Sequence, residues 1–311
     1  MKIHLLVNES AGNGHAKKIF DQTVLLLIDQ DIAFSFEKSN YAGELITLAE
    51  AYGNLTHSDN EYLIVIGGDG SLNEVLNGIK RSSQPNLPFA YLPAGTGNDF
   101  GRAANLTNQP KTLLKQLKKR PTPTLMDCGA FKIINRSQQT YYFANNLGIG
   151  FDAYVNHYSN HSNLKKLLNT LKQGKLSYIS YILKAVSKQD TFQVDVQSKS
   201  HKLHFNDAFL VTTTNHPYLG GGIPLLPSAS VTNHQIATVI VEKRSIPKLI
   251  KLFINLLKDG SHIKDPQFHY LEAKKITIKT YQPEFGQVDG EEIHPRAFEL
   301  ELTVNHFNLL K

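Results

Sequence analysis

Hydrophobic and polar positions alternate in two different ways along the chain. In residues 1–120, short continuous apolar runs such as residues 62–66 (YLIVI) are followed by stretches whose apolar residues recur at every third or fourth position, as in residues 72–79. A continuous apolar run indicates a strand buried on both faces, and the wider spacing indicates an amphipathic helix. Strands and helices in this order predict an α/β domain with a parallel sheet covered by helices.

A two-residue alternation replaces this pattern after Pro121-Thr122-Pro123, which we interpret as a linker. Residues 192–197, 275–279 and 298–304 each alternate between apolar and polar, as half-buried antiparallel strands do. Helical spacing returns in residues 164–187 and 246–257. The pattern therefore predicts two domains, an α/β domain over residues 1–122 and an antiparallel β-rich domain over residues 123–295.

The composition excludes several classes of protein. With 311 residues, of which 41% are hydrophobic and 19% charged, the chain is long enough for two folded domains and is not globally disordered. The longest aliphatic run, residues 24–28, is far shorter than the roughly 20 apolar residues of a membrane-spanning helix. The single cysteine, Cys128, excludes an intrachain disulfide and fits a reducing compartment.

The net charge and the histidines do little to identify a partner or a metal site. A net charge of +6 favours an anionic partner but does not distinguish a nucleotide, a nucleic acid and an acidic membrane surface. Because no basic and aromatic motif typical of nucleic-acid binding is present, we expect no nucleic-acid partner. The close pairs His157/His161 and His201/His204 have no cysteine or carboxylate cluster at a zinc spacing, so we expect surface histidines rather than metal ligands.

The first candidate site is the loop in residues 66–74 (IGGDGSLNE), where a predicted buried strand turns into a helix. Glycines let a ligand approach the backbone, and the free N–H groups of a helix N-terminus suit phosphate. Asp69 would repel a phosphate unless a cation such as Mg²⁺ lay between them. The alternative interpretation is a tight turn in which the aspartate only caps the helix.

Two further glycine loops follow predicted strands of the same sheet. Residues 92–100 (LPAGTGNDF) supply two glycines, a hydroxyl, an amide and a carboxylate, and residues 8–16 (NESAGNGHA) form a weaker third loop. Ligands of open α/β sheets bind at the carboxyl ends of the strands, so the three loops are expected to converge there.

An acidic segment near the C-terminus, residues 287–292 (QVDGEE), has two interpretations. Asp-Gly is a common hairpin dipeptide, and composition alone favours a solvated turn. The functional interpretation is a carboxylate general base placed on that turn.

Residues 67–74, 93–100 and 289–291, in this order, resemble the three signatures of the diacylglycerol kinase catalytic domain family, which includes bacterial soluble lipid kinases and sphingosine kinases. The middle signature is the most specific, since NAD kinases and phosphofructokinases share the first. The resemblance extends over nearly the whole chain, including residues 8–14, 148–153 (GIGFDA), 174–178 (GKLSY) and 220–222 (GGG).

The resemblance implies an N-terminal α/β nucleotide-binding domain of the NAD kinase and diacylglycerol kinase type, and a C-terminal antiparallel β-rich domain with the lipid site. A tail at about residues 296–311 would pack back on the first domain. It also implies ATP and Mg²⁺ as cofactors, a cytoplasmic enzyme in peripheral contact with the inner membrane surface, and a homodimer as the frequent family assembly.

The resemblance assigns residues as follows. Asp69 and Asp99 would organise the catalytic magnesium, and the turn with Asp289 and Glu291 would supply the base, without deciding between these two. Lys175 resembles a family lysine linked to the site. The residues that would contact ATP are Asn8, Ser10, Ala11, Gly12, Asn13, Gly14, Ser39, Gly67, Gly68, Asp69, Gly70, Ser71, Asn73, Glu74, Gly95, Thr96 and Asn98.

The chain departs from the family in one turn. Bacterial relatives generally have an acidic turn at the position of residues 229–235 (ASVTNHQ), and it holds a structural magnesium. Because a neutral amide binds Mg²⁺ far less well than a carboxylate, we predict that this second site is weakened or absent. If it persists, its candidate ligands are Asn233 and the carbonyls of Ser230 and Gln235. Ser71 and Ser39 replace the more usual threonines but keep the hydroxyl.

The sequence thus favours an ATP- and Mg²⁺-dependent lipid kinase that converts diacylglycerol to phosphatidic acid. One alternative is an NAD kinase-like or other small-molecule kinase, which a water-soluble acceptor would support. The other is a catalytically silent regulator that binds lipid or nucleotide, against which the three aspartates Asp69, Asp99 and Asp289 argue.

Overall fold

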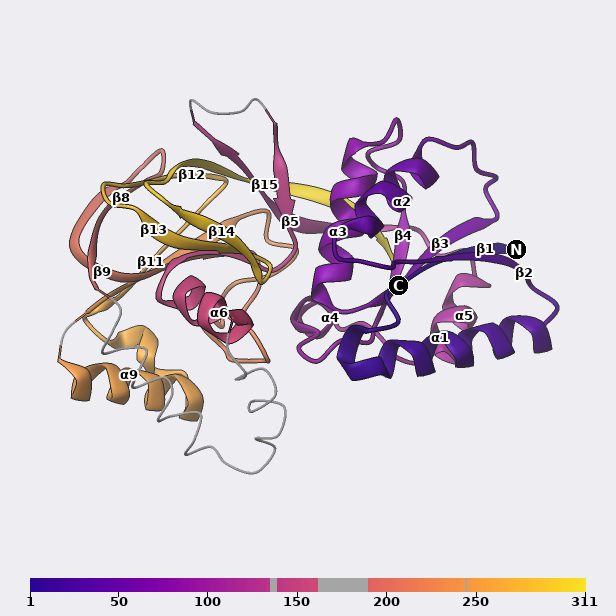
Figure 1. The fold of residues 1–311 in the computed structure, drawn as a ribbon, viewed down its shortest axis with the longest axis horizontal. Helices are drawn as coiled ribbons and strands as arrows, with labels where there is room; N and C mark the ends of the chain where they lie inside the picture. The colour runs from indigo at the N-terminus through magenta and orange to yellow at the C-terminus, as the bar shows by residue number, and fades with distance from the viewer. Residues whose placement is uncertain (135–138, 162–189, 244) are drawn as a thin grey trace.

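The computed structural model describes residues 1–311 except 135–138, 162–189 and 244. The helix predicted over residues 164–187 and Lys175 therefore lie outside the described residues. Two lobes stand side by side, joined by the long strands β5 (Thr124–Ile133) and β15 (Glu299–Leu310) (Figure 1). Both chain ends lie in the N-terminal lobe.

The N-terminal lobe is a parallel sheet between two layers of helices, as predicted. Its strands follow the order β2-β1-β3-β4. Their bounds are β1 (Lys2–Val7), β2 (Ala33–Lys38), β3 (Glu61–Gly67) and β4 (Phe89–Pro93). The helices are α1 (Ala11–Asp29), α2 (Glu44–Gly53), α3 (Asp69–Arg81), α4 (Asp99–Ala103) and α5 (Pro110–Leu117).

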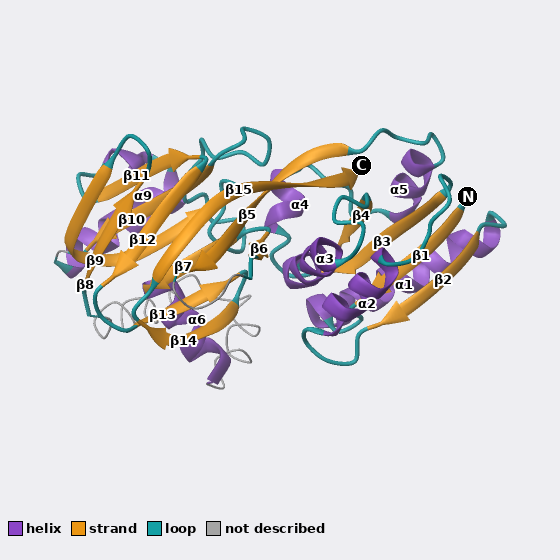
Figure 2. Ribbon diagram, turned by 90° about the horizontal axis from the view of Figure 1, so that it is seen from above, coloured by secondary structure: helices purple, strands orange, loops and turns teal. Residues whose placement is uncertain are grey.

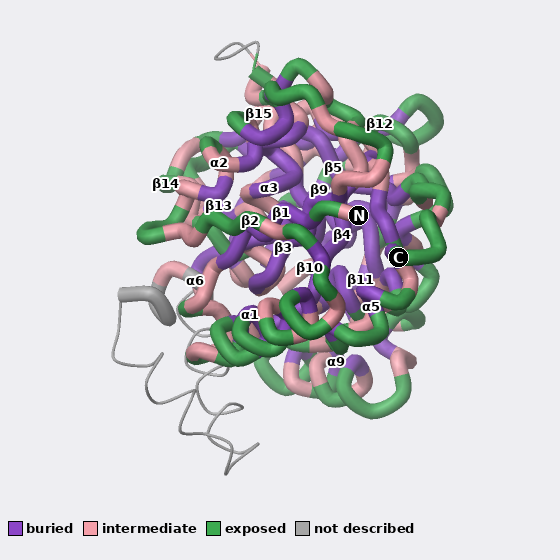
Figure 3. The backbone as a smooth tube through the Cα atoms, turned by 90° about the vertical axis from the view of Figure 1, so that its right-hand side faces the viewer, coloured by how far each residue is buried: buried purple, intermediate pink, exposed green. Residues whose placement is uncertain are grey.

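Burial on both faces explains the continuous apolar strands of this lobe. In β3, Leu63 and Val65 pack into the cluster formed with α2 and α3, whereas Ile64 and Ile66 pack with α1 and α5. Because successive side chains of a strand point to opposite faces, every position must be apolar when both faces are covered. The centre of the lobe is accordingly buried and the outer face of α1 exposed (Figure 3).

The C-terminal lobe is built from antiparallel strands, as the two-residue alternation predicted. Viewed from above, its strands continue those of the first lobe through β5 and β15 (Figure 2). The strand bounds are β6 (Tyr141–Phe143), β7 (Asn146–Gly150), β8 (Phe192–Gln197), β9 (Lys202–Thr214), β10 (Ile236–Glu242), β11 (Phe268–Ala273), β12 (Lys275–Thr280), β13 (Glu284–Val288) and β14 (Glu291–Arg296). Helices α6 (Phe151–His161) and α9 (Ile246–Lys258) and the short 3₁₀ helix η1 (Ser261–Lys264) complete the described part.

Strand β15 joins the parallel and the antiparallel parts of one continuous sheet. It pairs antiparallel with β5 and β12, and its last residues then pair parallel with β4 through Leu309 and Leu310. An α/β domain with a parallel sheet and an antiparallel β-rich region is thus the observed architecture, in agreement with the predicted fold class. The domain boundaries after residues 122 and 295 remain predictions.

Candidate active site

The three glycine loops meet at the carboxyl edge of the parallel sheet. A Cβ atom on Gly95 would lie 2.6 Å from the Cα atom of Gly68, and a Cβ atom on Gly12 would lie 2.3 Å from the carbonyl oxygen of Ala94. Only glycine permits such close backbone approaches. The glycines therefore bring loops from three separate segments into contact, as the sequence predicted.

A cavity of about 330 Å³, here called the loop cavity, opens between these loops. It is lined by Asn8, Ser10, Ala11, Gly12, Ser39, Asn40, Tyr41, Ala42, Gly68, Gly70, Ser71, Glu74, Gly95, Thr96 and Glu291. Most predicted ATP contacts thus surround one space. Asn40, Tyr41 and Ala42 were not predicted, because no glycine or charge in the sequence distinguishes them.

The hydroxyl of Ser71 is available to hydrogen-bond a ligand. It lies in the first turn of α3, is 3% exposed, and its Oγ atom has no hydrogen-bond partner among the described residues. A buried hydroxyl without a partner carries a desolvation cost that a bound ligand would remove. It therefore favours a polar ligand in the loop cavity.

Six predicted ATP contacts do not line the loop cavity: Asp69, which faces a second cavity described below, and five others. Gly67 lies beneath it against Ser71, and Asn98 exchanges two hydrogen bonds with the backbone of Gly95. Asn73 points to the C-terminal lobe, and Asn13 and Gly14 occupy the kink at the start of α1. These five residues shape or support the loops rather than face the cavity.

Asp69 and Asp99 face a second cavity of about 280 Å³, here called the acid cavity. Their Oδ2 atoms converge on Gly97, where an added Cβ atom would lie 3.2 Å from Asp69 and 3.5 Å from Asp99. Burial and then the neighbouring charge of Asp99 raise the pKa of Asp69 to about 6. Two carboxylates held close in a desolvated place repel each other, and a bound cation relieves that repulsion.

Both lobes hold Asp99. The Nη1 atom of Arg102 donates to its Oδ1 atom at 2.5 Å, and the backbone N–H of Gly222 donates to the same oxygen at 2.7 Å. Gly222 has a φ of +81° and belongs to the triple glycine of the C-terminal lobe. Because these two donors occupy Oδ1, the Oδ2 atom of Asp99 is the one that faces the acid cavity.

Asp289 occupies a two-residue hairpin turn between β13 and β14, as its Asp-Gly dipeptide predicted. Asp289 and Gly290 have φ values of +48° and +90°, and Val288 pairs with Glu291 across the turn. The turn directs the Asp289 carboxylate into the protein, where it lines the acid cavity. The hairpin and the functional interpretation are therefore compatible.

Four donors surround the Asp289 carboxylate. Oδ1 accepts hydrogen bonds from the backbone N–H groups of Asn145 and Asn146, at 2.9 and 2.8 Å. Oδ2 accepts from the backbone N–H of Ala144 at 2.7 Å and from Nδ2 of Asn73 at 2.8 Å. Burial raises the pKa of Asp289 to about 6 although these donors act to lower it.

Glu291 is placed differently from Asp289. It begins β14 and lines the loop cavity, opposite Glu74 in the first turns of α3. The Glu74 carboxylate accepts the backbone N–H groups of Gly43 and Leu45, and burial raises its pKa. Asp289 and Glu291, the two acidic residues of this turn, thus face two different cavities.

Asp152 is a site residue that we did not predict individually. It lies in the first turn of α6, accepts hydrogen bonds from Thr212 Oγ1 and Gln287 Nε2 at 3.1 Å each, and has a pKa raised by burial to about 6. A Cβ atom on Gly148 would lie 1.8 Å from its Oδ2 atom, which explains the glycine there. Asn145, Asn146 and Gln287 also line the acid cavity and were missed.

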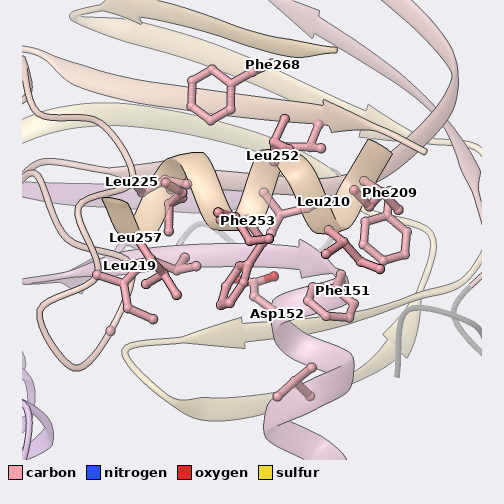
Figure 4. Close-up of a pocket in the computed structure, with 18 residues that line it drawn as sticks. Phe151, Asp152, Phe209, Leu210, Leu219, Leu225, Leu252, Phe253, Leu257 and Phe268 are labelled. Atoms are coloured by element: carbon pink, nitrogen blue, oxygen red, sulfur yellow. The ribbon is translucent and has the colours of Figure 1, made fainter. Parts of the chain in front are cut away.

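A third cavity of about 330 Å³, here called the apolar cavity, adjoins the acid cavity. It lies between α9, the start of α6 and strand β9, and its walls include Phe151, Phe209, Leu252 and Phe253 (Figure 4). Asp152 is the one charged residue in this lining. Three residues line both the apolar and the acid cavities: Asp152, Leu219 and Gly220.

The turn at which we predicted a weakened or absent magnesium site is a local hydrogen-bonded loop. Asn233 Oδ1 accepts the backbone N–H of Gln235 at 3.2 Å, and the hydroxyl of Ser230 contacts that of Thr232 at 3.1 Å. The weakened magnesium site at Ser230, Asn233 and Gln235 remains a prediction.

The fold and the three cavities define a two-lobed enzyme of the NAD kinase-like architecture. A solved yeast NADH kinase in complex with NADH has this fold, with a TM-score of 0.53 at 10% identity over 100% of this chain and 83% of that chain. A solved diacylglycerol kinase of Bacillus anthracis str. Sterne is more similar, with a TM-score of 0.67 at 20% identity over 99% of this chain and 96% of that chain.

Sequence comparison identifies the family. Residues 2–129 match the diacylglycerol kinase catalytic domain, and residues 145–310 match the YegS C-terminal NAD kinase beta sandwich-like domain. A diacylglycerol kinase of Staphylococcus epidermidis is 31% identical over 93% of this chain and 85% of its own length. The chain belongs to the diacylglycerol kinase catalytic domain family and is a lipid kinase. None of the helices in the described part of the chain has the length and apolar character needed to cross a membrane.

Proposed function

We propose that the protein transfers the γ-phosphate of ATP to the hydroxyl group of diacylglycerol and so forms phosphatidic acid. The observation that carries this proposal is that the apolar cavity adjoins the acid cavity, with Asp152, Leu219 and Gly220 lining both. An acyl chain suits an apolar space, and its polar end would lie beside the carboxylates. Several relatives are named diacylglycerol kinase, which supports this acceptor.

ATP is proposed to bind in the loop cavity. The backbone N–H groups at the start of α3 and of the glycines in the first two loops would donate hydrogen bonds to its phosphates, and the Ser71 hydroxyl would gain a partner. The loop cavity and the acid cavity are lined by successive residues of the same loops, such as Gly68 and Asp69. The γ-phosphate would therefore point toward the acid cavity.

Asp69 and Asp99 are proposed to hold Mg²⁺. The convergence of their Oδ2 atoms at Gly97 and the raised pKa of Asp69 fit a cation, and carboxylate oxygens are its preferred ligands. When bound, Mg²⁺ supplies charge neutralisation to the transferred phosphoryl group. The role of the protein is to hold the two carboxylates in place, with Arg102 and Gly222 fixing Asp99.

Asp289 is proposed to receive the proton of the acceptor hydroxyl. It shares the acid cavity with Asp69, whereas Glu291 faces the loop cavity. One of its four donors is a side chain, Asn73, whose Nδ2 atom also donates to the carbonyl of Tyr142 at 2.9 Å. Because the other three donors are backbone N–H groups fixed by the fold, the hydrogen bond from the Asn73 side chain is the one that a substrate hydroxyl would replace. Asp152, at the junction of the cavities, would orient the same hydroxyl.

The activity should depend on pH through Asp289. With a pKa of about 6, this carboxylate is ionised at neutral pH and becomes protonated as the pH falls through 6. We expect kcat/KM to be half-maximal near pH 6 and then to fall about tenfold for each further pH unit. An ordinary aspartate would give this limb near pH 4. A pH profile that stays flat down to pH 4.5 would exclude Asp289 as the base.

Narrowing the apolar cavity should discriminate between acyl chain lengths. Ile223 is half-buried in its wall, so Ile223→Trp would fill part of it. We expect kcat/KM for long-chain diacylglycerol to fall by about tenfold or more, since a few lost methylene contacts cost about 1–3 kcal/mol, whereas dioctanoyl-glycerol should be affected less. The control is Ile28→Trp on the exposed face of α1. An equal loss for both chain lengths would contradict this assignment of the cavity.

A further inference from the structure

Three side chains from distant segments meet where the loop before β10 lies against strands β5 and β15. Asp127 lies in β5, His306 lies opposite it in β15, and His234 lies in the loop before β10. The Nδ1 atoms of His306 and His234 lie 2.8 and 3.0 Å from the Oδ1 atom of Asp127. None of the three residues lines a cavity described above.

The geometry matches a metal centre with one open side. One ligand atom from each residue lies within 4.8 Å of the others. In a tetrahedral site with bonds of about 2.0–2.1 Å, ligand atoms lie about 3.3 Å apart, so the two Nδ1–Oδ1 distances of 2.8 and 3.0 Å need to lengthen only slightly to admit an ion. The Asp127 carboxylate is fully buried, whereas the side chains of His234 and His306 are 53% and 36% exposed. A metal could therefore be reached from solvent, and water could complete its coordination.

The surrounding backbone holds the carboxylate in position. The backbone N–H of His234 donates to the Oδ2 atom of Asp127 at 2.6 Å, so that Oδ1 faces the two imidazoles. The N–H of Asp127 donates to the carbonyl of Val231, and Nδ2 of Asn215 donates to the carbonyl of Asp127. Such hydrogen bonds around a ligand fix its orientation and tune its affinity for a metal.

We propose that Asp127, His234 and His306 bind a divalent transition-metal ion, with Zn²⁺ as the best match. Two imidazoles and one carboxylate are ligands typical of zinc, whereas Mg²⁺ prefers a shell of oxygen atoms. This donor set differs from the oxygen ligands predicted for magnesium at Ser230, Asn233 and Gln235. Neither histidine belongs to the pairs His157/His161 and His201/His204, for which we expected a surface position.

The bound metal has a structural role. It ties the loop that contains His234 to β5 and β15, the two strands that join the lobes. Binding to the folded state alone stabilises it by mass action, so the melting temperature should rise with Zn²⁺ concentration. The proposal does not depend on the proposed kinase reaction, because no residue of the acid cavity takes part.

The test is a titration of the purified, chelator-treated full-length protein with Zn²⁺ in competition with a chromophoric chelator, without ATP or lipid. We expect one ion per chain and a rise in melting temperature. His306→Ala and His234→Ala should each weaken the affinity by at least about a hundredfold, and Mg²⁺ should not compete. His204→Ala, which removes an exposed histidine paired with Asp195, is the matched control.

The proposal is wrong if the wild-type protein binds no Zn²⁺, or if both variants bind it as tightly as the wild type does. If the alanine variants unfold, His306→Gln is measured in their place, because it keeps much of the side-chain volume while removing the imidazole. Full affinity in a folded His306→Gln protein would overturn the assignment of His306.

Discussion

Asp69→Asn is expected to reduce phosphoryl transfer by about a thousandfold or more. The substitution removes one of the two carboxylates that converge at Gly97, and with it the charge that would hold Mg²⁺ beside the γ-phosphate. It also removes the repulsion from Asp99 that contributes to the raised pKa of Asp69. The carboxylate also accepts the backbone N–H groups of Asp99 and Phe100, one of which would lose its acceptor in the amide. Because this loss opposes the relief of repulsion, the melting temperature without Mg²⁺ should change little while the rate falls.

Labelled phosphate transfer and thermal unfolding, measured on the same preparations, would check this prediction. Asp59→Asn, which changes an exposed aspartate of the same lobe, is the matched control and should leave both quantities unchanged. A marked drop in melting temperature for Asp69→Asn would indicate that the carboxylate supports the fold. Retention of more than a tenth of the wild-type rate would contradict its proposed role.

Asp289→Asn is expected to lower kcat by about a hundredfold to ten-thousandfold, the range that general-base catalysis contributes. The amide cannot take up the hydroxyl proton at neutral pH. Its NH₂ group would also face backbone N–H donors, so a loss of stability of about 1–3 kcal/mol should accompany the change. Rates should therefore be compared well below the melting temperature of the variant.

The pH profile separates catalysis from structure in this variant. If Asp289 is the base, the residual activity of Asp289→Asn should no longer fall near pH 6. Asp207→Asn, which alters an exposed aspartate of the C-terminal lobe, should keep the wild-type profile. An unchanged acid limb in Asp289→Asn would assign that limb to another carboxylate, with Asp69 and Asp152 the next candidates because the pKa of each is also about 6.

The parts of the site that could be predicted are those encoded in short segments. A glycine loop between a strand and a helix is a local property, and the rule that strands of a parallel sheet end at one edge was sufficient to bring Gly12, Gly68 and Gly95 together. The placement of Ser71 and Glu74 could also be predicted, because both lie in the first turns of a helix that starts at Asp69. The continuous apolar runs and the two-residue alternation are local properties too, so they were sufficient to predict the parallel and the antiparallel strands.

Contacts across long sequence separations could not be predicted in this way. Gln287 and Asp152 are 135 positions apart, and Asp289 reaches Asn145 across 144 positions. Nothing in the sequence around Asp152 distinguishes it from other aspartates, and only the folded C-terminal lobe places it between two cavities. Asp127 and His306 are likewise 179 positions apart, so spacing rules based on neighbouring histidines could not find them.

The central claim is that this chain phosphorylates a lipid hydroxyl with ATP. The most direct measurement is transfer of label from γ-labelled ATP into diacylglycerol in detergent micelles with Mg²⁺, for the wild type beside Asp69→Asn. Labelled phosphatidic acid formed by the wild type and nearly absent with the variant is the predicted result. Intact ATP binding with no labelled lipid would contradict it, and label in a water-soluble acceptor instead would indicate a small-molecule kinase on the same fold.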